Sequence, residues 1–192
     1  MALLLLPTLK NTATSFYGPS GEPGTPHLCI VGSNAQFYTK FEQQNETSIF
    51  ESLRGDRDIY NRYANTKLIS LLIMREVAKK MSESENPVIL NMVDPGFCES
   101  ELLRERTWPW YFKLMMAVSI PVLARTAEMG ARTYIWAASA GPESHGRYIE
   151  DCELSTPAPL ADAEEGRQLQ VRIFGELVDV LNGIVPKVTE NI

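Results

Sequence analysis

The stretch "HLCIVGS", residues 27–33, is a short apolar run that predicts a buried strand. Pro26 and Gly32 bound it, and both residue types commonly mark the limits of a strand. A second apolar run, "PVILNMV" at 87–93, leads into the turn "DPGF" and predicts a second buried strand. A third, shorter strand is expected in "GRYIE", residues 146–150.

Helical patterns lie between and after these strands. Residues 59–82 predict a long helix with two apolar stripes on different faces. The stripes consist of Ala64, Leu68, Leu71 and Leu72 on one face and of Ile69, Ile73 and Val77 on another. Two stripes indicate that a sheet covers one side of this helix and that a second helix or subunit covers the other. Further helices are expected in the first ten residues, in 125–139 and in 162–182.

The alternation of strands and helices predicts an α/β fold with a parallel sheet, in a single domain over residues 1–192. Two segments do not follow this pattern. Residues 34–58 are polar and predict a long loop that is either functional or mobile. Residues 98–123 are irregular, aromatic and apolar, and they include Trp108 and Trp110.

The composition is that of a soluble globular protein and argues against several kinds of partner. Hydrophobic residues make up 44% of the 192 residues and charged residues make up 22%. The net charge is -6 and the basic residues are scattered, so no nucleic-acid partner is expected. The apolar stretches are too short to cross a bilayer, so no membrane span is expected either.

The cysteines and histidines suggest neither a disulfide framework nor a metal site. Cys29, Cys98 and Cys152 are an odd number of widely spaced thiols, which is typical of reduced cysteines in a cytoplasmic protein. His27 and His145 are far apart and have no Cys, Asp or Glu at ligand spacing. We therefore expect no metal in this chain.

The long helix carries the one pair of residues with a clear chemical use. Tyr63 and Lys67 stand four positions apart, so both project from the same face of the helix. An ammonium group near a phenol favours the phenolate and lowers the tyrosine pKa toward neutral pH. A tyrosine of this kind exchanges protons with a carbonyl or alcohol oxygen. Ser33, which follows the first strand, is placed to donate a hydrogen bond to the same oxygen.

The Tyr-x-x-x-Lys pair alone is weak support, because chance gives one in about one chain in four of this composition. Its context is more specific. A strand ends at Gly32-Ser33, the helix with Tyr63 and Lys67 follows, and the next strand ends at Pro95-Gly96. This order resembles the short-chain dehydrogenase/reductase family. The later stretch at 128–159 resembles its retinol-dehydrogenase-like branch, which includes enzymes of fungal secondary metabolism.

The resemblance implies a role for each matching residue. Ser33 matches the serine that polarises the substrate, and Tyr63 matches the catalytic acid/base. Lys67 matches the lysine that lowers the tyrosine pKa and holds the nicotinamide ribose. Pro95 and Gly96 match the turn beneath the nicotinamide, so Tyr63, Lys67 and this turn are also the expected cofactor-binding residues.

Two further groups of residues are assigned by the same resemblance. The family's turn continues Pro-Gly-x-Val-x-Thr, and here Cys98 and Ser100 stand at the last two specified positions. Ser100 keeps the hydroxyl of that motif, so both residues are expected beside the cofactor. Trp108 and Trp110 begin a stretch that is expected to form an apolar lid over the substrate, although simple packing explains such aromatic residues equally well.

The family's N-terminal elements have no counterpart in this sequence. The turn Gly-x-x-x-Gly-x-Gly, which approaches the cofactor pyrophosphate, occurs nowhere in the 192 residues. The residue that selects NAD or NADP is absent with it. The resemblance therefore implies the C-terminal part of the family's fold, an incomplete, doubly wound Rossmann-like parallel sheet with flanking helices. Because the strand at 27–31 then lacks a neighbour on one edge, we expect a homo-oligomer or a complementing chain.

Three functions are compatible with these residues. The first is an NADP- or NAD-dependent oxidoreductase that interconverts an apolar alcohol and ketone, such as a secondary-metabolite intermediate. The second is a redox-inactive enzyme in which Ser33, Tyr63 and Lys67 catalyse an isomerisation, cyclisation or dehydration without nicotinamide. The third is a non-catalytic fragment. The missing phosphate loop favours the second over the first, whereas the family resemblance favours the first.

Overall fold

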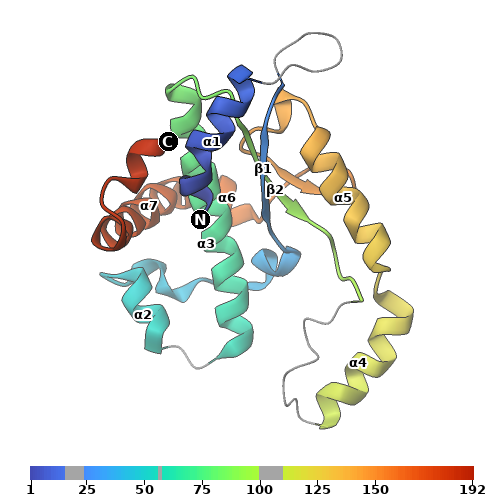
Figure 1. Cartoon of the computed structure of the whole chain (residues 1–192). Helices are drawn as coiled ribbons and strands as arrows, with labels where there is room; N and C mark the ends of the chain where they lie inside the picture. Colours follow the sequence, from blue (N-terminus) through green and yellow to red (C-terminus); the bar gives the residue numbers. More distant parts are fainter. Residues whose placement is uncertain (16–23, 56–57, 100–109) are drawn as a thin grey trace.

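The computed structural model describes residues 1–15, 24–55, 58–99 and 110–192. Its centre is one sheet of four strands in the order β1-β2-β3-β4 (Figure 1). The strands are β1 (His27–Val31), β2 (Ile89–Asp94), β3 (Tyr148–Glu150) and β4 (Glu153–Ser155). The first three run parallel, and β4 returns antiparallel to β3. The expected incomplete Rossmann-like parallel sheet is confirmed, and the antiparallel β4 is an addition that the sequence pattern did not show.

Helices cover both faces of this sheet (Figure 1). On one face lie α1 (Ala2–Ser15), α3 (Ile59–Glu83) and α7 (Glu164–Ile184), and on the other lies α5 (Ala127–Ser139). The side chains of each strand alternate between the two faces, as the pleat requires. Met92 and Tyr148 therefore join the large core beneath α3, whereas Val93 and Ile149 pack against α5.

The predicted long helix is confirmed almost to its ends as α3. All the residues of its first apolar stripe are buried, and Ile69 and Val77 of the second are each 6% exposed. The helix packs on the sheet with one side and against α7 with another. The expectation that it is covered on two sides is confirmed, and the second cover is a helix of the same chain.

The expectation of a long loop at 34–58 is wrong. The described part of this segment forms η1 (Asn34–Tyr38), η2 (Glu42–Asn45) and α2 (Ile49–Gly55). Phe41 and Ile49 are fully buried and hold the segment on the main core. Each helix is short and contributes few apolar residues, so no local periodicity announced it.

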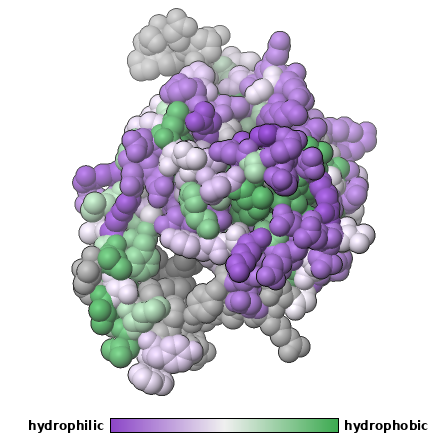
Figure 2. Space-filling view, turned by 180° about the vertical axis from the view of Figure 1, so that it is seen from behind, coloured by the Kyte–Doolittle hydropathy of each residue, from purple (hydrophilic) through white to green (hydrophobic). Residues whose placement is uncertain are grey.

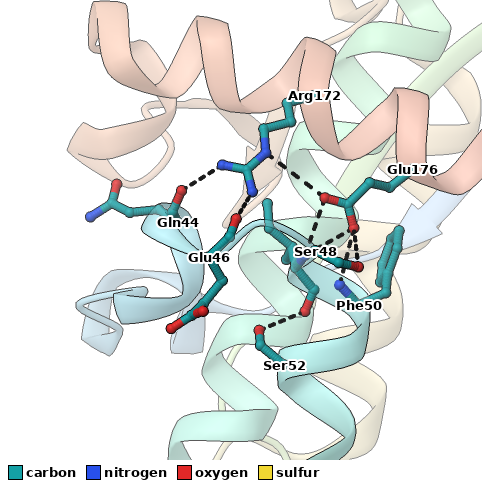
Figure 3. A network of polar contacts seen from close by, with 8 residues as sticks. Gln44, Glu46, Ser48, Phe50, Ser52, Arg172 and Glu176 are labelled. Atoms are coloured by element: carbon teal, nitrogen blue, oxygen red, sulfur yellow. Dashed lines mark hydrogen bonds and ion pairs between the residues drawn. The ribbon is translucent and has the colours of Figure 1, made fainter.

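Two charged side chains of α7 hold this segment in place (Figure 3). Arg172 donates hydrogen bonds to the carbonyl oxygens of Gln44, at 2.7 Å, and of Glu46. The carboxylate of Glu176 accepts from the backbone N–H groups of Ile49, at 2.9 Å, and Phe50, at 3.2 Å. A carboxylate at the N-terminus of α2 satisfies donors that the helix itself leaves unpaired. These contacts from α7 stabilise residues 44–50, a polar stretch whose own sequence shows no helical pattern.

The irregular segment before residue 123 also contains a helix, α4 (Trp110–Leu123), which the sequence pattern did not predict. Several of its large side chains are exposed, among them Trp110, Leu114 and Val118. Figure 1 shows α4 reaching away from the sheet, and Figure 2 shows apolar residues gathered on its surface. Because apolar residues such as these are spread around the helix and not confined to one stripe, helical periodicity gives no signal here.

The remaining elements are short and complete the C-terminal half. They are η4 (Pro142–Ser144), α6 (Pro159–Asp162) and η5 (Val188–Asn191). The expected final helix at 162–182 is confirmed as α7, with α6 as a separate turn before it. Within the described residues, no helix combines the length and the apolar character that crossing a membrane requires.

Candidate active site

Ser33 lies just beyond the carboxyl end of β1, where it begins η1. Its Oγ accepts a hydrogen bond of 3.2 Å from the backbone N–H of Ala35, so the side chain caps this short helix. No acceptor among the described residues takes the proton of the hydroxyl. That O–H can therefore be directed toward the oxygen of a bound substrate.

Gly32 keeps this end of β1 close to β2. Its backbone N–H donates to the carbonyl oxygen of Val93 at 2.8 Å. A Cβ at this position would lie 2.8 Å from Cγ of Met92, closer than carbon atoms pack. The missing side chain allows the two strands to stay in contact as far as Ser33.

Tyr63 and Lys67 project together from α3, as their spacing predicted. The Nζ atom of Lys67 lies 5.6 Å from the centre of the Tyr63 ring. The same ammonium group donates a hydrogen bond of 3.0 Å to the carbonyl oxygen of Val31, the last residue of β1. Tyr63 is 45% exposed, so its ring is accessible from outside the protein.

The Pro95-Gly96 turn follows β2 directly. Gly96 has a φ of +76°, a backbone conformation that suits glycine, and its N–H donates to Oδ1 of Asp94 at 2.8 Å. The Sγ atom of Cys98 donates to the carbonyl oxygen of Pro95 at 3.2 Å. A Cβ on Gly96 would stand 3.0 Å from the guanidinium group of Arg125. The turn is therefore packed closely on its inner side.

These groups meet at one edge of the sheet. Val31 pairs with Val93 in the parallel register, so the segments after β1 and β2 emerge side by side. Ser33, Lys67 and the Pro95-Gly96 turn are thus gathered at the carboxyl ends of two neighbouring strands. In open parallel α/β sheets, this edge is where ligands bind.

The described part of the chain does not show the remaining predicted site residues at this edge. Ser100 and Trp108 lie outside the described residues. Trp110 begins α4 and is 76% exposed. The lid expected from Trp108 and Trp110 is therefore still a prediction.

The structure also brings in residues that the sequence reasoning missed. Asp94 is 2% exposed and accepts a hydrogen bond of 2.7 Å from the hydroxyl of Tyr148, which is 1% exposed. Arg125 forms an ion pair with Asp151, and this hydrogen bond lowers the pKa of the Asp151 carboxyl below its usual value. Burial raises the pKa of the neighbouring Glu150. A local signal existed only for Asp94, a polar residue at the end of an apolar run.

A cavity of about 300 Å³ lies apart from this edge, between α3 and the β3-β4 pair. Its lining includes Leu71, Arg75 and Ser155, and Arg75 is already paired with Asp162 at 2.8 Å. Ser33, Tyr63 and Lys67 do not line it. In the part of the chain that the structure describes, no three His, Cys, Asp or Glu side chains are arranged to hold a metal ion.

Sequence comparison relates the chain to enzymes of fungi. It is 34% identical to the short chain dehydrogenase/reductase dmxR8 of Cryptosporiopsis sp., over 100% of this chain and 57% of that protein. It is 38% identical to the short chain dehydrogenase atnD of Emericella nidulans, over 66% and 41% of the two chains. For the short-chain dehydrogenase/reductase phmF of Phaeosphaeria nodorum, the identity is 30%, over 94% and 52%. The chain spans about half the length of these curated relatives.

Comparison with solved structures supports the Rossmann-like fold. A crystal structure of an uncharacterized protein from Mycobacterium paratuberculosis matches 81% of this chain and 51% of its own with a TM-score of 0.53, at 15% identity. No family model matches the sequence. Given its similarity to dmxR8, which extends over the whole of this chain, and its Rossmann-like sheet, the chain belongs to the short-chain dehydrogenase/reductase family.

Proposed function

We propose that this chain provides the acid/base machinery of an NADP- or NAD-dependent oxidoreductase that interconverts an apolar alcohol and ketone. Tyr63 is the proton donor and acceptor, Lys67 is its electrostatic partner, and Ser33 binds the substrate oxygen. The proposal extends to a secondary-metabolite intermediate as one such substrate; the relatives are fungal short-chain dehydrogenases.

One observation carries this proposal. The Lys67 ammonium lies 5.6 Å from the Tyr63 ring and is anchored to the end of β1 at 3.0 Å, two residues before Ser33. A positive charge held at this place stabilises negative charge that develops on the tyrosine oxygen. Anchoring by a backbone carbonyl also limits the motion of a long, flexible side chain, so the charge is preorganised.

The residues at this edge fit the nicotinamide end of the cofactor. Gly96 has a left-handed backbone conformation and no side chain, so the turn stays compact between Asp94 and Arg125. Lys67 and the Pro95-Gly96 turn would hold the ribose and the nicotinamide, with Cys98 supporting the turn through its bond to Pro95. When bound, the cofactor supplies or removes a hydride. The sequence contains no Gly-x-x-x-Gly-x-Gly turn for the pyrophosphate.

The chain's own residues would transfer the proton and bind the substrate oxygen. During reduction of a ketone, the hydroxyl of Tyr63 gives its proton to the carbonyl oxygen as that oxygen becomes an alkoxide. Ser33 donates a hydrogen bond to the same oxygen and orients it. The Lys67 charge offsets the negative charge left on Tyr63. During oxidation of an alcohol, the proton moves in the reverse direction, from the alcohol oxygen to Tyr63.

A second candidate function uses the same residues of this chain without a cofactor. With Ser33 and Tyr63 directed at a carbonyl oxygen, the chain could catalyse an isomerisation, cyclisation or dehydration in which no hydride moves. Such reactions need the same polarised oxygen and the same proton donor. They do not need a pyrophosphate site.

Titration of the purified chain with NADPH and with NADH, followed by nicotinamide fluorescence, tests the first candidate. We expect saturable binding that Lys67→Met weakens and that Tyr38→Phe, at an 80% exposed tyrosine, does not change. Turnover of a panel of apolar ketones should then fall in Tyr63→Phe.

The outcomes separate the candidates. Tyr63-dependent turnover of a carbonyl compound without any nicotinamide response supports the second function. Absence of both nicotinamide binding and Tyr63-dependent turnover, in a chain with native circular dichroism, contradicts both and leaves a non-catalytic role.

A further inference from the structure

Asp94 is a buried carboxylate at the point where β2 passes into the Pro95-Gly96 turn. It is 2% exposed, and its two oxygens have different donors. Oδ1 accepts from the N–H of Gly96 at 2.8 Å, and Oδ2 accepts from the hydroxyl of Tyr148 at 2.7 Å. No ion pair within the described residues includes Asp94. These two hydrogen bonds therefore have to compensate much of the cost of burying the charge.

Tyr148 is the partner that makes this arrangement rigid. It is the first residue of β3, is 1% exposed and lies opposite Met92 in the parallel register. Burial and the neighbouring Asp94 raise the pKa of its phenol, so the hydroxyl stays protonated and acts as the donor. A side chain fixed in the core can hold the Asp94 carboxylate in one orientation, which a water molecule at the surface cannot do.

The hydrogen bond from Gly96 to Asp94 sets the conformation of the turn itself. A side-chain oxygen that accepts from the N–H two residues later stabilises a tight turn. Further along, Phe97 accepts from the N–H of Arg125 at 2.8 Å, and Glu99 donates to the Arg125 carbonyl at 2.9 Å. Those two bonds tie down the chain after the turn. The Pro95-Gly96 segment itself is connected to β2 by the hydrogen bond from Gly96 to the Asp94 carboxylate.

Tyr148 also reaches the segment that leads to Ser33. Its Cε2 atom would be 3.6 Å from a Cβ placed on Gly32. The phenol ring thus lies close to the side-chain position that Gly32 leaves empty, and its hydroxyl donates to Asp94. One side chain from β3 therefore hydrogen-bonds the last residue of β2 and lies near Gly32, which follows β1 and precedes Ser33.

We infer that Asp94 and Tyr148 are positioning residues that hold the Gly32-Ser33 and Pro95-Gly96 segments in one fixed arrangement at the carboxyl edge of the sheet. Neither residue exchanges a proton with the substrate. Their effect on catalysis rests on the proposed function, since the segments they hold are the serine and the turn of that site. Their effect on the turn's conformation does not depend on that function.

The test is nuclear magnetic resonance of the isotopically labelled chain without any cofactor. Tyr148→Phe removes only the hydroxyl, so we expect the Gly96 amide signal to shift and its hydrogen exchange to become faster by about tenfold. Asp94→Asn should shift the same signal, and the double variant should add little to either change because one network is involved. Tyr38→Phe, at an exposed tyrosine of η1, is the matched control and should leave Gly96 unchanged.

Unchanged Gly96 shift and exchange in both Tyr148→Phe and Asp94→Asn would overturn the inference. If Tyr148→Phe does not fold, Asp94→Asn alone decides, since it keeps the size of the side chain. A second measurement addresses catalysis: where the native chain turns over a carbonyl compound, Tyr148→Phe should raise KM about tenfold and leave the pH profile of kcat in place. A shifted pH profile would instead make Tyr148 part of the proton-transfer machinery.

Discussion

Lys67 holds its ammonium group 5.6 Å from the centre of the Tyr63 ring while it donates a hydrogen bond to the last carbonyl of β1. The two residues come from one turn of α3, so their mutual approach is a property of the helix alone. Their position at the end of β1 is a property of the packing between α3 and the sheet. The first relationship makes the pair chemically useful, and the second puts it beside Ser33.

The charge of Lys67 and the hydroxyl of Tyr63 should act as a unit. Tyr63→Phe is expected to lower kcat at least about 100-fold, and Lys67→Met by a similar factor, because each removes part of one proton-transfer step. The double variant should be little worse than either single variant. Steady-state kinetics of the four proteins measures this, and additive losses would show that the two residues act separately.

Arg172 and Glu176 of α7 should keep the segment between Ser33 and Tyr63 ordered. Glu176→Ala removes the acceptor for the N–H groups of Ile49 and Phe50, and we expect the free energy of unfolding to fall by about 1–2 kcal/mol. Hydrogen exchange in residues 44–50 should increase more than in β2. Asp179→Ala, at an exposed position of the same helix, is the control that should change neither measurement. Equal effects of the two substitutions would contradict a specific cap.

Two glycines of α7 should respond in opposite directions to alanine. A Cβ on Gly166 would lie 1.7 Å from the carbonyl oxygen of Leu160, so Gly166→Ala should destabilise the protein by at least about 2 kcal/mol. Gly175 has no atom within 4 Å of such a Cβ, so Gly175→Ala should stabilise it by about 0.5–1 kcal/mol. Urea denaturation of both variants measures these changes. A Gly166→Ala variant as stable as the native chain would contradict the close contact between Gly166 of α7 and Leu160 of α6.

Glu150 should reduce stability at neutral pH. Burial raises the pKa of its carboxyl, so the folded chain binds the proton more tightly than the unfolded chain. The favourable contribution of the protonated form is complete below the unfolded pKa and is lost as pH rises through the higher folded pKa. Glu150→Gln is therefore expected to stabilise the protein at pH 7, by less than about 1 kcal/mol because solvent screens the site. The gain should disappear as the pH falls below the pKa of an ordinary glutamate. Thermal melts of both proteins over a range of pH measure it, and a Glu150→Gln variant that is less stable than the native chain at pH 7 would contradict the prediction.

Among the described residues, no strand pairs with the edge of β1 that faces away from β2, and this edge should recruit another strand. Gly32 donates to Val93 and Ile89 donates to Pro26, so the even-numbered residues of this strand face β2. The N–H groups of Cys29 and Val31 consequently face away from the sheet, and Val31 is 48% exposed. An exposed apolar edge pairs readily with another chain, so we expect concentration-dependent self-association in sedimentation velocity.

A substitution at that edge tests the mechanism of association. Val31→Pro removes an N–H that the β1-β2 pairing does not use, so it should lower association while the fold is kept. Val31→Thr retains the N–H and a branched side chain, and it should associate like the native chain. A native chain that stays monomeric over the accessible concentrations would refute this expectation.

Much of the architecture could be predicted because its signals are local. The runs "HLCIVGS" and "PVILNMV" are continuous and apolar, and the stripes of α3 repeat with helical period. Such patterns place β1, β2 and α3, and with them the serine, the tyrosine and lysine, and the Pro-Gly turn. The pattern of 34–58 predicts a loop, because the order of this segment comes from Phe41, Ile49 and the side chains of α7. Helix α4 gives no such signal, since several of its large apolar side chains, among them Trp110, Leu114 and Val118, are exposed.

By itself, then, the sequence determined which side chains the candidate site contains, since strand ends and helix faces follow from spacing along the chain. Only the tertiary structure decided what holds them. The hydrogen bond between Asp94 and Tyr148 joins residues 54 positions apart, and the ion pair between Arg125 and Asp151 joins residues 26 positions apart. Pairing over such distances depends on which strands become neighbours and which face each side chain takes. No periodicity in the chain encodes that choice, because it is made by the packing of the whole sheet between its helices.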